Sequence, residues 1–333
     1  MQRNALIREI AYYHPDNVVH NDYYIEHFKQ QNKSIQGLLK ATGRENRYIT
    51  TDINETIIDM GLKAAEKVLK KAYVKATELD MIVFATGTPE YISPTNALIL
   101  HEKLGAKQKC GVYDINTSCA GMLMALEQVS RCMQSRIDTK YTLIVSSDQL
   151  NRFSDTSSPI TYANFGDAAC AILLESVSNT DRGLIDSDFY TNSGSCERIL
   201  FPAKGLSTAM RDTDAALEDR LIQWDKFDLS GAFNSAHISI KDLMFRNNLK
   251  KSDVKKYFIS QFSLGNIKGI CQDLEEDMDK FIFIGDEFGY TGSSSPLIAY
   301  ARAVENKELE VGDNIIFWTV GAGLTCISML YKQ

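Results

Sequence analysis

The sequence predicts an α/β protein in which a mainly parallel sheet is covered by helices on both faces. Short β-branched runs alternate with stretches that carry apolar residues at helical spacing, which is the pattern of such a fold. The same order of strands and helices also occurs in both halves of the chain, which indicates an internal duplication. The chain has 333 residues, 44% of them hydrophobic, enough for a core of this size.

In the first half, β-branched runs such as MIVFA predict strands, and AGMLMALEQVSRCMQ has the apolar spacing of a helix. The predicted elements are, in chain order, a strand over 81–87, a helix over 95–104, a strand over 111–118, a helix over 120–134, and strands over 142–148 and 167–175.

The second half repeats this order. Its predicted elements are a helix over 231–248, a strand over 255–261, a helix over 264–274, a Gly/Ser-rich turn over 285–295, a helix that ends at Glu305, and strands over 314–321 and 324–331. The segment 190–230 has little periodicity, so we expect loops and a short helix there. We therefore place one unit at 1–175 and a second at 176–333.

Composition excludes several classes of function. The net charge of −7 argues against a nucleic-acid partner, which usually needs a basic face. No apolar run is long enough for a membrane span, and the N-terminal residues lack the apolar core of a signal peptide, so we expect a cytoplasmic protein. Seven cysteines without regular spacing and five scattered histidines predict reduced thiols and no zinc site.

Cys119 is the candidate nucleophile, in the segment DINTSCAGM where a predicted strand gives way to a helix. Backbone N–H groups at a helix start favour a thiolate, and the small neighbours leave room for a carbonyl group. The Cys119 N–H and another from a tight turn could hold an oxyanion. A buried structural cysteine is the alternative. The other cysteines are predicted to be inert, namely Cys110, Cys132, Cys170, Cys196, Cys271 and Cys326.

Five segments, in order along the chain, resemble the ketoacyl synthase III branch of the thiolase superfamily. YDINTSCAGMLMAL resembles the nucleophile motif of that family, and YANFGDAACAILLE its Phe-Gly-Asp-Gly-Ala strand turn. The other three are ATGRENRYIT, DMIVFATGTPEYISPTNALILHEKLG and the terminal VGAGLTC.

The resemblance implies a thiolase fold, an internally duplicated α/β/α/β/α sandwich with two mixed, largely parallel sheets. The half 1–175 would carry the nucleophile, and 176–333 the remaining site residues. It also implies that Cys119 accepts an acyl group from an acyl carrier protein or a coenzyme A thioester, with no metal or redox cofactor. A homodimer is expected, or a heterodimer with a paralogue.

The chain departs from the family at both catalytic partners of the cysteine. The His-Gln-Ala-Asn segment of the family reads SQFSLGN here, which places Gln261, or Phe262 after a one-residue slip, at the histidine position. The asparagine turn reads GYTGSSS, which places Tyr290 at that position. Glutamine donates a hydrogen bond but is no general base near neutral pH. Ala322 is expected to supply the second oxyanion N–H.

Other residues could replace the missing base. His237 lies in a predicted helix, where a surface or core role is the alternative, and Asp286 and Glu287 precede the tyrosine turn, where solvated acids are the alternative. Burial of either carboxyl would raise its pKa toward a useful value.

Donor recognition also differs from coenzyme A-primed relatives. The tryptophan and arginine that sandwich adenine in those relatives correspond to positions near Gly37 and Pro159, so a carrier-bound donor is favoured. The arginine of the family's early Gly-Ile-Arg segment corresponds to Arg44 or Glu45. The basic residue with which the family contacts the carrier protein corresponds to a position near Asn266, with Lys268 close by. A lysine cluster could meet an acidic carrier or form a solvated face; it comprises Lys250, Lys251, Lys255 and Lys256.

The sequence therefore supports three hypotheses. The first is an acyltransferase in which Cys119 takes an acyl group and a second substrate removes it, with Gln261 and Tyr290 polarising the thioester. The second is a catalytically degenerate binding subunit paired with an active paralogue. The third is decarboxylative condensation to a 3-oxoacyl-carrier product by substituted residues.

Overall fold

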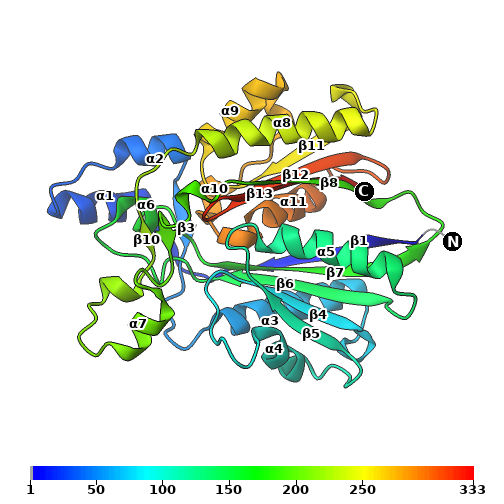
Figure 1. Cartoon of the computed structure of the whole chain (residues 1–333), viewed down its shortest axis with the longest axis horizontal. Coiled ribbons are helices and arrows are strands. Elements are labelled where there is room, and N and C mark those ends of the chain that lie inside the picture. The colour runs from blue at the N-terminus through cyan, green and yellow to red at the C-terminus, as the bar shows by residue number, and fades with distance from the viewer. Residues whose placement is uncertain (1–2) are drawn as a thin grey trace.

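The computed structural model describes residues 3–333 and consists of five stacked layers (Figure 1). Two sheets enclose a central pair of helices, and a further pair covers the outer face of each sheet. The central pair is α5 (Gly121–Ser135) and α11 (Ser295–Glu305). The outer helices are α3 (Ile57–Ala72) and α4 (Asn96–Leu104) on the first sheet, and α8 (Ser230–Arg246) and α9 (Leu264–Leu274) on the second.

Within residues 3–333, the first sheet has five strands in the order β1-β7-β6-β4-β5. β4 pairs in parallel with β5 and β6, whereas β7 pairs antiparallel with β6 and β1. The strands are β1 (Arg3–Tyr13), β4 (Met81–Ala85), β5 (Gly111–Ile115), β6 (Tyr141–Asp148) and β7 (Ala168–Ser178).

The second sheet repeats this arrangement. Its order in the described chain is β8-β13-β12-β11, and an isolated parallel bridge from Tyr257 to Phe281 stands where the first sheet has its fifth strand. β11 and β12 are parallel, and the other two pairs are antiparallel. The strands are β8 (Gly183–Thr191), β11 (Val254–Ile259), β12 (Asn314–Gly321) and β13 (Thr325–Lys332).

The duplicated sandwich with mixed sheets is thus confirmed, but the sheets are less parallel than expected. In each half the first and last strands of the unit pair antiparallel, and only the inner strands connected through helices are parallel. Parallel neighbours need a crossover helix, but antiparallel neighbours do not. The alternation of strands and helices in the sequence therefore led to too high an expected number of parallel strand pairs.

The central helices are hydrophobic on most of their surface because both sheets contact them. In α5, Met122, Leu123 and Leu126 are completely buried, and in α11 Leu297 and Ile298 are as well. These residues share one hydrophobic core with side chains from both sheets. A second core lies between the first sheet and the outer helices α3 and α4, and a third between the second sheet and α8 and α9.

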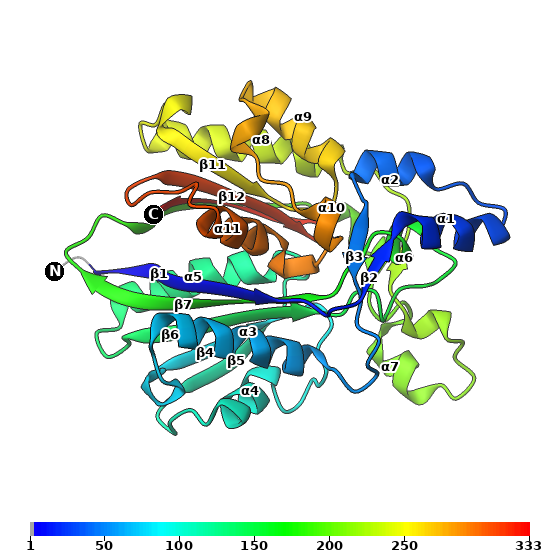
Figure 2. The same ribbon diagram turned by 180° about the vertical axis from the view of Figure 1, so that it is seen from behind.

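The remaining elements gather at one end of the sandwich, as both views show (Figures 1 and 2). The segment 190–230 contains a short helix, as expected, but also a two-stranded ribbon of β9 and β10. These elements are α1 (Asn21–Gln30), α2 (Gln36–Thr42), α6 (Pro159–Tyr162), α7 (Gly205–Arg211), α10 (Gly285–Phe288), β2 (Val18–His20), β3 (Asn46–Tyr48), β9 (Ile199–Leu200) and β10 (Gln223–Trp224). Among residues 3–333, no helix has the length and apolar character needed to cross a membrane.

Candidate active site

Cys119 lies in the tight turn between β5 and α5. The helix begins at Gly121 with Ala120 as its N-cap, so the cysteine precedes the helix by two residues rather than opening it. The turn is closed by hydrogen bonds from the Ala120 N–H to the Thr117 carbonyl at 3.1 Å and from the Gly121 N–H to the Ser118 carbonyl at 3.0 Å. Ser118 has a φ of 50°, a left-handed conformation that few non-glycine residues adopt.

The glycine-rich turn after β12 packs directly on this cysteine turn. A Cβ atom at Gly321 would collide with the Thr117 carbonyl oxygen, so only glycine permits the approach. The Thr319 hydroxyl donates to the Cys119 carbonyl at 3.3 Å. Cys119 and Ala322 therefore line the same cavity, and within the described chain neither backbone N–H donates to a protein acceptor.

The phenol of Tyr290 reaches the Cys119 sulfur from the opposite half of the molecule. Two hydrogen bonds fix the main chain of Tyr290. The Tyr290 N–H donates to the Asn164 carbonyl at 2.9 Å, and the Tyr290 carbonyl accepts from the Gly166 N–H at 3.0 Å. The Tyr290 hydroxyl lies beside the Cys119 sulfur and lowers the pKa of that thiol. The buried Ser260 hydroxyl lies beside this phenol and has no hydrogen-bond partner among residues 3–333.

Gln261 does not face the thiol, and this expectation was wrong. Its side-chain amide donates to the carbonyls of Ile259 at 2.7 Å and Ile282 at 3.0 Å, and its oxygen accepts from the Ile284 N–H at 2.8 Å. Ser260 and Phe262, its neighbours, line the cavity instead. Matching the glutamine of the His-Gln-Ala-Asn segment to Gln261 places Ser260 at the histidine position. The slip considered from sequence runs one residue toward the C-terminus, to Phe262. The hydrogen bonds of Gln261 instead favour a shift of one residue toward the N-terminus, to Ser260.

Burial raises the pKa of the Cys119 thiol to about 12. The neighbouring Tyr290 hydroxyl opposes this shift, and the Asp148 carboxylate adds to it. Burial also raises the pKa of the Tyr290 phenol well above its ordinary value, with the neighbouring cysteine as the next cause. The helix start therefore does not suffice to make a thiolate in the resting site, because desolvation is the larger effect.

Asp148 is a residue of this site that sequence reasoning missed. It ends β6, is 1% exposed, and lines the cavity. One carboxylate oxygen accepts from the Thr86 hydroxyl at 3.0 Å and the Gly87 N–H at 2.8 Å. The other accepts from the Ser293 hydroxyl at 2.7 Å and its N–H at 3.1 Å. These donors satisfy the carboxylate, which joins the turns of the two halves below the cavity.

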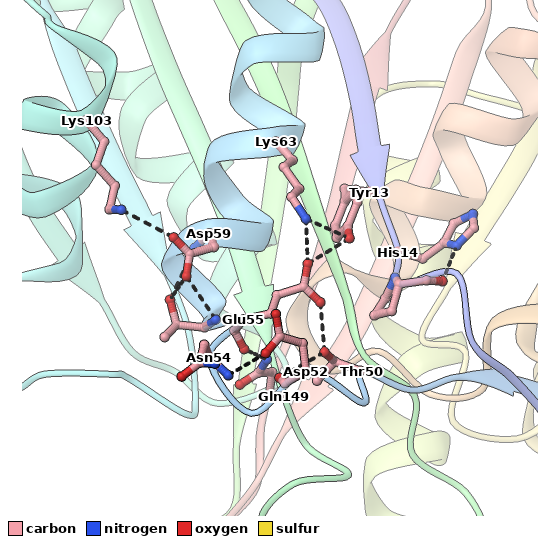
Figure 3. Close-up of polar contacts among 12 residues, drawn as sticks. Tyr13, His14, Thr50, Asp52, Asn54, Glu55, Asp59, Lys63, Lys103 and Gln149 are labelled. Atoms are coloured by element: carbon pink, nitrogen blue, oxygen red, sulfur yellow. Dashed lines mark hydrogen bonds and ion pairs between the residues drawn. The ribbon is translucent and has the colours of Figure 1, made fainter.

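The strand end that carries Asp148 is anchored by the polar network shown in Figure 3. The Gln149 amide donates to the Glu55 carbonyl at 2.6 Å. The Glu55 carboxylate accepts from Lys63 at 2.6 Å, from the Tyr13 hydroxyl at 2.7 Å and from the Thr50 hydroxyl at 2.8 Å. These contacts hold the segment before α3 against the end of β6.

The cavity above Cys119 has a volume of about 160 Å³ and mostly apolar walls. Trp224 and Phe262 stack with ring centroids 5.1 Å apart, and Phe262 meets Tyr290 edge to face at 5.2 Å. Ile199, Leu200 and Phe201 complete the wall from the segment whose sequence lacks periodicity. Cys119, which is partly exposed, thus lies in a small pocket with mostly apolar walls.

Comparison with known proteins agrees with this arrangement. Residues 113–193 match the family model 3-oxoacyl-[acyl-carrier-protein] synthase III, and residues 244–333 match the model of its C-terminal domain. The chain is a ketoacyl synthase III-like member of the thiolase superfamily. The family is one of acyltransferases, so the expectation of a transferase is confirmed.

Relatives and solved structures cover the whole chain. A beta-ketoacyl-[acyl-carrier-protein] synthase III of Clostridium perfringens strain SM101 is 28% identical over 329 residues, 99% of each chain. One from Xanthomonas campestris strain 8004 is 27% identical over 320 residues, 96% of this chain and 95% of the relative. The crystal structure of 3-oxoacyl-[acyl-carrier-protein] synthase III from Aquifex aeolicus VF5 superimposes with a TM-score of 0.86 at 23% identity, covering 99% of this chain and all of that one (100%), and so shows the fold.

None of the alternative bases of this ketoacyl synthase III-like protein reaches the cavity. Within residues 3–333, no histidine lines it, and the His237 imidazole lies 3.6 Å from the Asp273 carboxylate on the outer helices. Glu287 accepts from the Tyr48 hydroxyl at 3.2 Å and pairs with Arg302. Asp286 lines a separate surface groove beside Arg44.

Arg44 is a structural residue of the site and not a surface contact for a donor. Its guanidinium is 2% exposed and donates to the carbonyls of Gln261, Phe262 and Gly285, each at 2.7 Å, and to the Asn164 side chain at 2.6 Å. Burial lowers its pKa to about 9. Arg44 thus holds the turn that carries Ser260 and Phe262.

The residues considered for donor binding are dispersed. Asn266 lines the cavity, whereas Glu45 is exposed near α2, which contains Gly37. The lysine cluster lies at the start of β11, and Ser260 follows the end of that strand, about 17 Å away at the usual rise per residue. Lys251 and Lys256 pair with Glu275 at 2.8 Å and Glu308 at 2.7 Å. This cluster is therefore a paired surface away from the cavity.

The remaining cysteines are dispersed through the described chain. Cys170, Cys271 and Cys326 are buried, and Cys196 is exposed. Among residues 3–333, no group of three or more His, Cys, Asp or Glu side chains is arranged to hold a metal ion.

Proposed function

We propose that this protein is an acyltransferase that takes an acyl group from a carrier-bound or coenzyme A thioester onto Cys119 and passes it to a second substrate without decarboxylation. The observation that carries the proposal is the composition of the cavity. Cys119, from the segment that resembles the family's nucleophile motif, lines it together with Ser260 and Tyr290, which the motif resemblance matches to the histidine and asparagine. Neither hydroxyl is a general base near neutral pH.

Acylation needs no resident base. The Cys119 sulfur attacks the thioester carbonyl, the carbon–sulfur bond to the donor breaks, and the thiol proton ends on the leaving thiolate. The Tyr290 hydroxyl, which can both donate and accept, lies beside the sulfur to relay that proton. The N–H groups of Cys119 and Ala322 would stabilise the oxyanion, a contribution of about 2.7–4 kcal/mol per donor.

The second half of the reaction is attack on the acyl-cysteine by an oxygen, nitrogen or carbon nucleophile. The acyl carbon bonds to that nucleophile, the bond to the Cys119 sulfur breaks, and the nucleophile's proton returns to the thiol. Decarboxylation of a malonyl group would instead require stabilisation of a full enolate. Among the described residues the cavity has no imidazole for this, and the nearby Asp148 carboxylate would oppose an added negative charge.

A carrier-bound donor is favoured over free coenzyme A. The two positions that would clamp an adenine ring are occupied by Gly37 in α2 and Pro159 in α6, which offer neither an aromatic ring nor a guanidinium group. An acyl carrier protein brings its thioester on a flexible arm and does not depend on such a clamp.

Intact-protein mass spectrometry tests the acylation step. After incubation with hexanoyl-acyl carrier protein, we expect one hexanoyl group per chain, located on Cys119 by peptide mapping. The adduct should be absent from Cys119→Ala and should persist in Cys196→Ala, which removes an exposed cysteine. No adduct on the unchanged protein would refute the proposal and favour a catalytically degenerate subunit.

The partner at the open edge of the first sheet is proposed to be a second copy of this chain. In the described chain β5 has no neighbour on its outer side, and Tyr91, Ile92 and Leu98 near it are exposed. Sedimentation velocity should show a dimer for the unchanged protein. Ile92→Asp should dissociate this dimer. Ile137→Asp, which changes an equally apolar exposed residue elsewhere, should leave the dimer intact. A monomeric wild-type protein would leave a heterodimer with a paralogue as the explanation.

A further inference from the structure

The walls of the Cys119 cavity are unusually rich in aromatic rings. The indole of Trp224 and the ring of Phe262 are parallel within 5°. Phe262 stands at 88° to Tyr290, and Phe165 lies 5.8 Å from Trp224 and 6.0 Å from Tyr290. All four rings line the cavity and pack against one another both face to face and edge to face, the arrangements that aromatic pairs use.

The aromatic walls are held in place by hydrogen bonds from both sides. Phe262 is fixed through its carbonyl by the Arg44 guanidinium at 2.7 Å. The strand with Trp224 is fixed by the Ile222 N–H, which donates to the Phe153 carbonyl at 2.8 Å, and by the Asp225 N–H, which donates to the Arg198 carbonyl at 2.8 Å. These bonds fix the main chain that carries Phe262 and Trp224, so a bound group meets rings that project from a held backbone.

The cavity is also small. Its volume of about 160 Å³ is close to that of an apolar protein cavity, about 150 Å³, that binds benzene. Leu200 and Phe201 line both this cavity and a separate polar groove, so their side chains separate the two hollows. A long acyl chain could extend from the cavity into the polar groove only by displacing the side chains of Leu200 and Phe201.

From the shape, the size and the ring lining together, we infer that the acyl group carried by Cys119 contains a single six-membered aromatic ring, and that Phe262 and Trp224 select it. This inference rests on the proposed acyl transfer to Cys119 and adds the class of acyl group. The ring would lie over the sulfur, against the Trp224–Phe262 pair, with the carbonyl oxygen at the N–H groups of Cys119 and Ala322.

Competition between matched thioesters tests the inference. N-acetylcysteamine thioesters of phenylacetate, cyclohexylacetate and dodecanoate place a CH₂ group next to the carbonyl, so their intrinsic reactivity is similar. Each transfers its acyl group to Cys119 and releases N-acetylcysteamine. By intact-mass kinetics we expect phenylacetyl transfer about two- to tenfold faster than cyclohexylacetyl transfer, the range of an aromatic contact, and at least about tenfold faster than dodecanoyl transfer.

Two variants locate the selectivity. Phe262→Ala and Trp224→Ala should each reduce the phenylacetyl-to-dodecanoyl ratio at least about tenfold, because they remove a ring and open the wall. Phe281→Ala is the matched control, since it removes a buried ring that stacks on Tyr257 on the outer side of the second sheet and should leave the ratio unchanged. Ratios are insensitive to the fraction of folded protein.

The outcomes separate this inference from the proposed function. Equal rates for all three thioesters on Cys119, or a faster cyclohexylacetyl transfer, would overturn the inference and leave acyl transfer standing. A ratio that falls equally in Phe281→Ala would overturn the assignment to Phe262 and Trp224. No adduct from any thioester or from hexanoyl-acyl carrier protein would overturn both.

Discussion

Two turns approach the cavity from the two sheets, and they are held in different ways. The turn after β5, with Cys119, is closed by its own backbone and by small residues that leave space around the sulfur. The turn after β11, with Ser260, is held by side chains, since Gln261 and Arg44 together donate five hydrogen bonds to its carbonyls and to those packed beside it.

This difference bears on which part of the family's chemistry the proposed function assigns to the chain. The nucleophile turn has the room and the free N–H groups that acyl transfer needs. The opposite turn keeps its backbone geometry but presents a hydroxyl and an aromatic ring to the cavity, where the family has an imidazole. Under the proposed function, the acyl-accepting half of the site is retained and the part that would handle a carbanion is replaced.

The pH dependence of Cys119 alkylation is the largest effect that this comparison predicts. Because burial raises the pKa of the thiol to about 12, the thiolate fraction should grow about tenfold per pH unit, or roughly 1,000-fold between pH 7 and 10. The rate is measured with iodoacetamide and peptide mapping of Cys119.

Free cysteine is the control for this measurement, because its thiol has a pKa of about 8.5 and its rate levels off within the same range. A plateau of the Cys119 rate below pH 9 would contradict the resting thiol and indicate a thiolate activated by its surroundings.

Tyr290→Phe removes the hydroxyl that lies beside the Cys119 sulfur and lowers the pKa of its thiol. A hydrogen bond to a charged group contributes about 1.5–3 kcal/mol, so we expect acylation to slow roughly ten- to hundredfold. Stopped acylation reactions analysed by mass spectrometry give the rate. Tyr300→Phe is the matched control, because its buried phenol bonds Gln333 at 2.7 Å between the sheets. Equal losses in both variants would sink the assignment.

Gln261→Leu should act on stability, since the side chain holds backbone groups together. Its loss leaves two carbonyls and one N–H without a partner in a buried turn, at about 1–3 kcal/mol each. We expect the free energy of unfolding in urea to fall by at least about 3 kcal/mol. The exposed Gln272 in α9 offers the control. We expect the free energy of unfolding of Gln272→Leu to lie within about 0.5 kcal/mol of the wild-type value. An unchanged stability would return Gln261 to the list of catalytic candidates.

Ser260→Ala is expected to have the smallest effect. The Ser260 hydroxyl lies beside the Tyr290 phenol but has no hydrogen-bond partner among residues 3–333, so we expect acylation to change less than about threefold, within the range of one weak hydrogen bond. Single-turnover acylation measures it. A loss of tenfold or more would show that the residue at the histidine position still takes part in the chemistry.

Much of the fold could be predicted from the sequence because its elements are strongly patterned. β4, β6, β12 and α5 lie within two residues of their expected bounds, since continuous burial demands apolar runs at strand or helix spacing. The ribbon of β9 and β10 could not be predicted, because strands of two residues have no period.

The site was harder to predict for physical reasons. A one-residue slip in a short motif exchanged Ser260 and Gln261, and only the hydrogen bonds of the Gln261 amide decide between them. The sequence shows that Cys119 stands near a helix start but not how deeply the sulfur is buried, and burial dominates its pKa. Asp148 was missed because an acid at the end of a strand usually meets solvent.

The most direct test of the account follows the acyl-cysteine after a malonyl donor is added. Hexanoyl-loaded enzyme is mixed with malonyl-acyl carrier protein, and intact mass is recorded over time. The account predicts that the hexanoyl group remains on Cys119 and that no 3-oxooctanoyl-carrier forms. Loss of the adduct together with formation of that product and release of carbon dioxide would contradict it, and would show that Ser260 and Tyr290 support condensation.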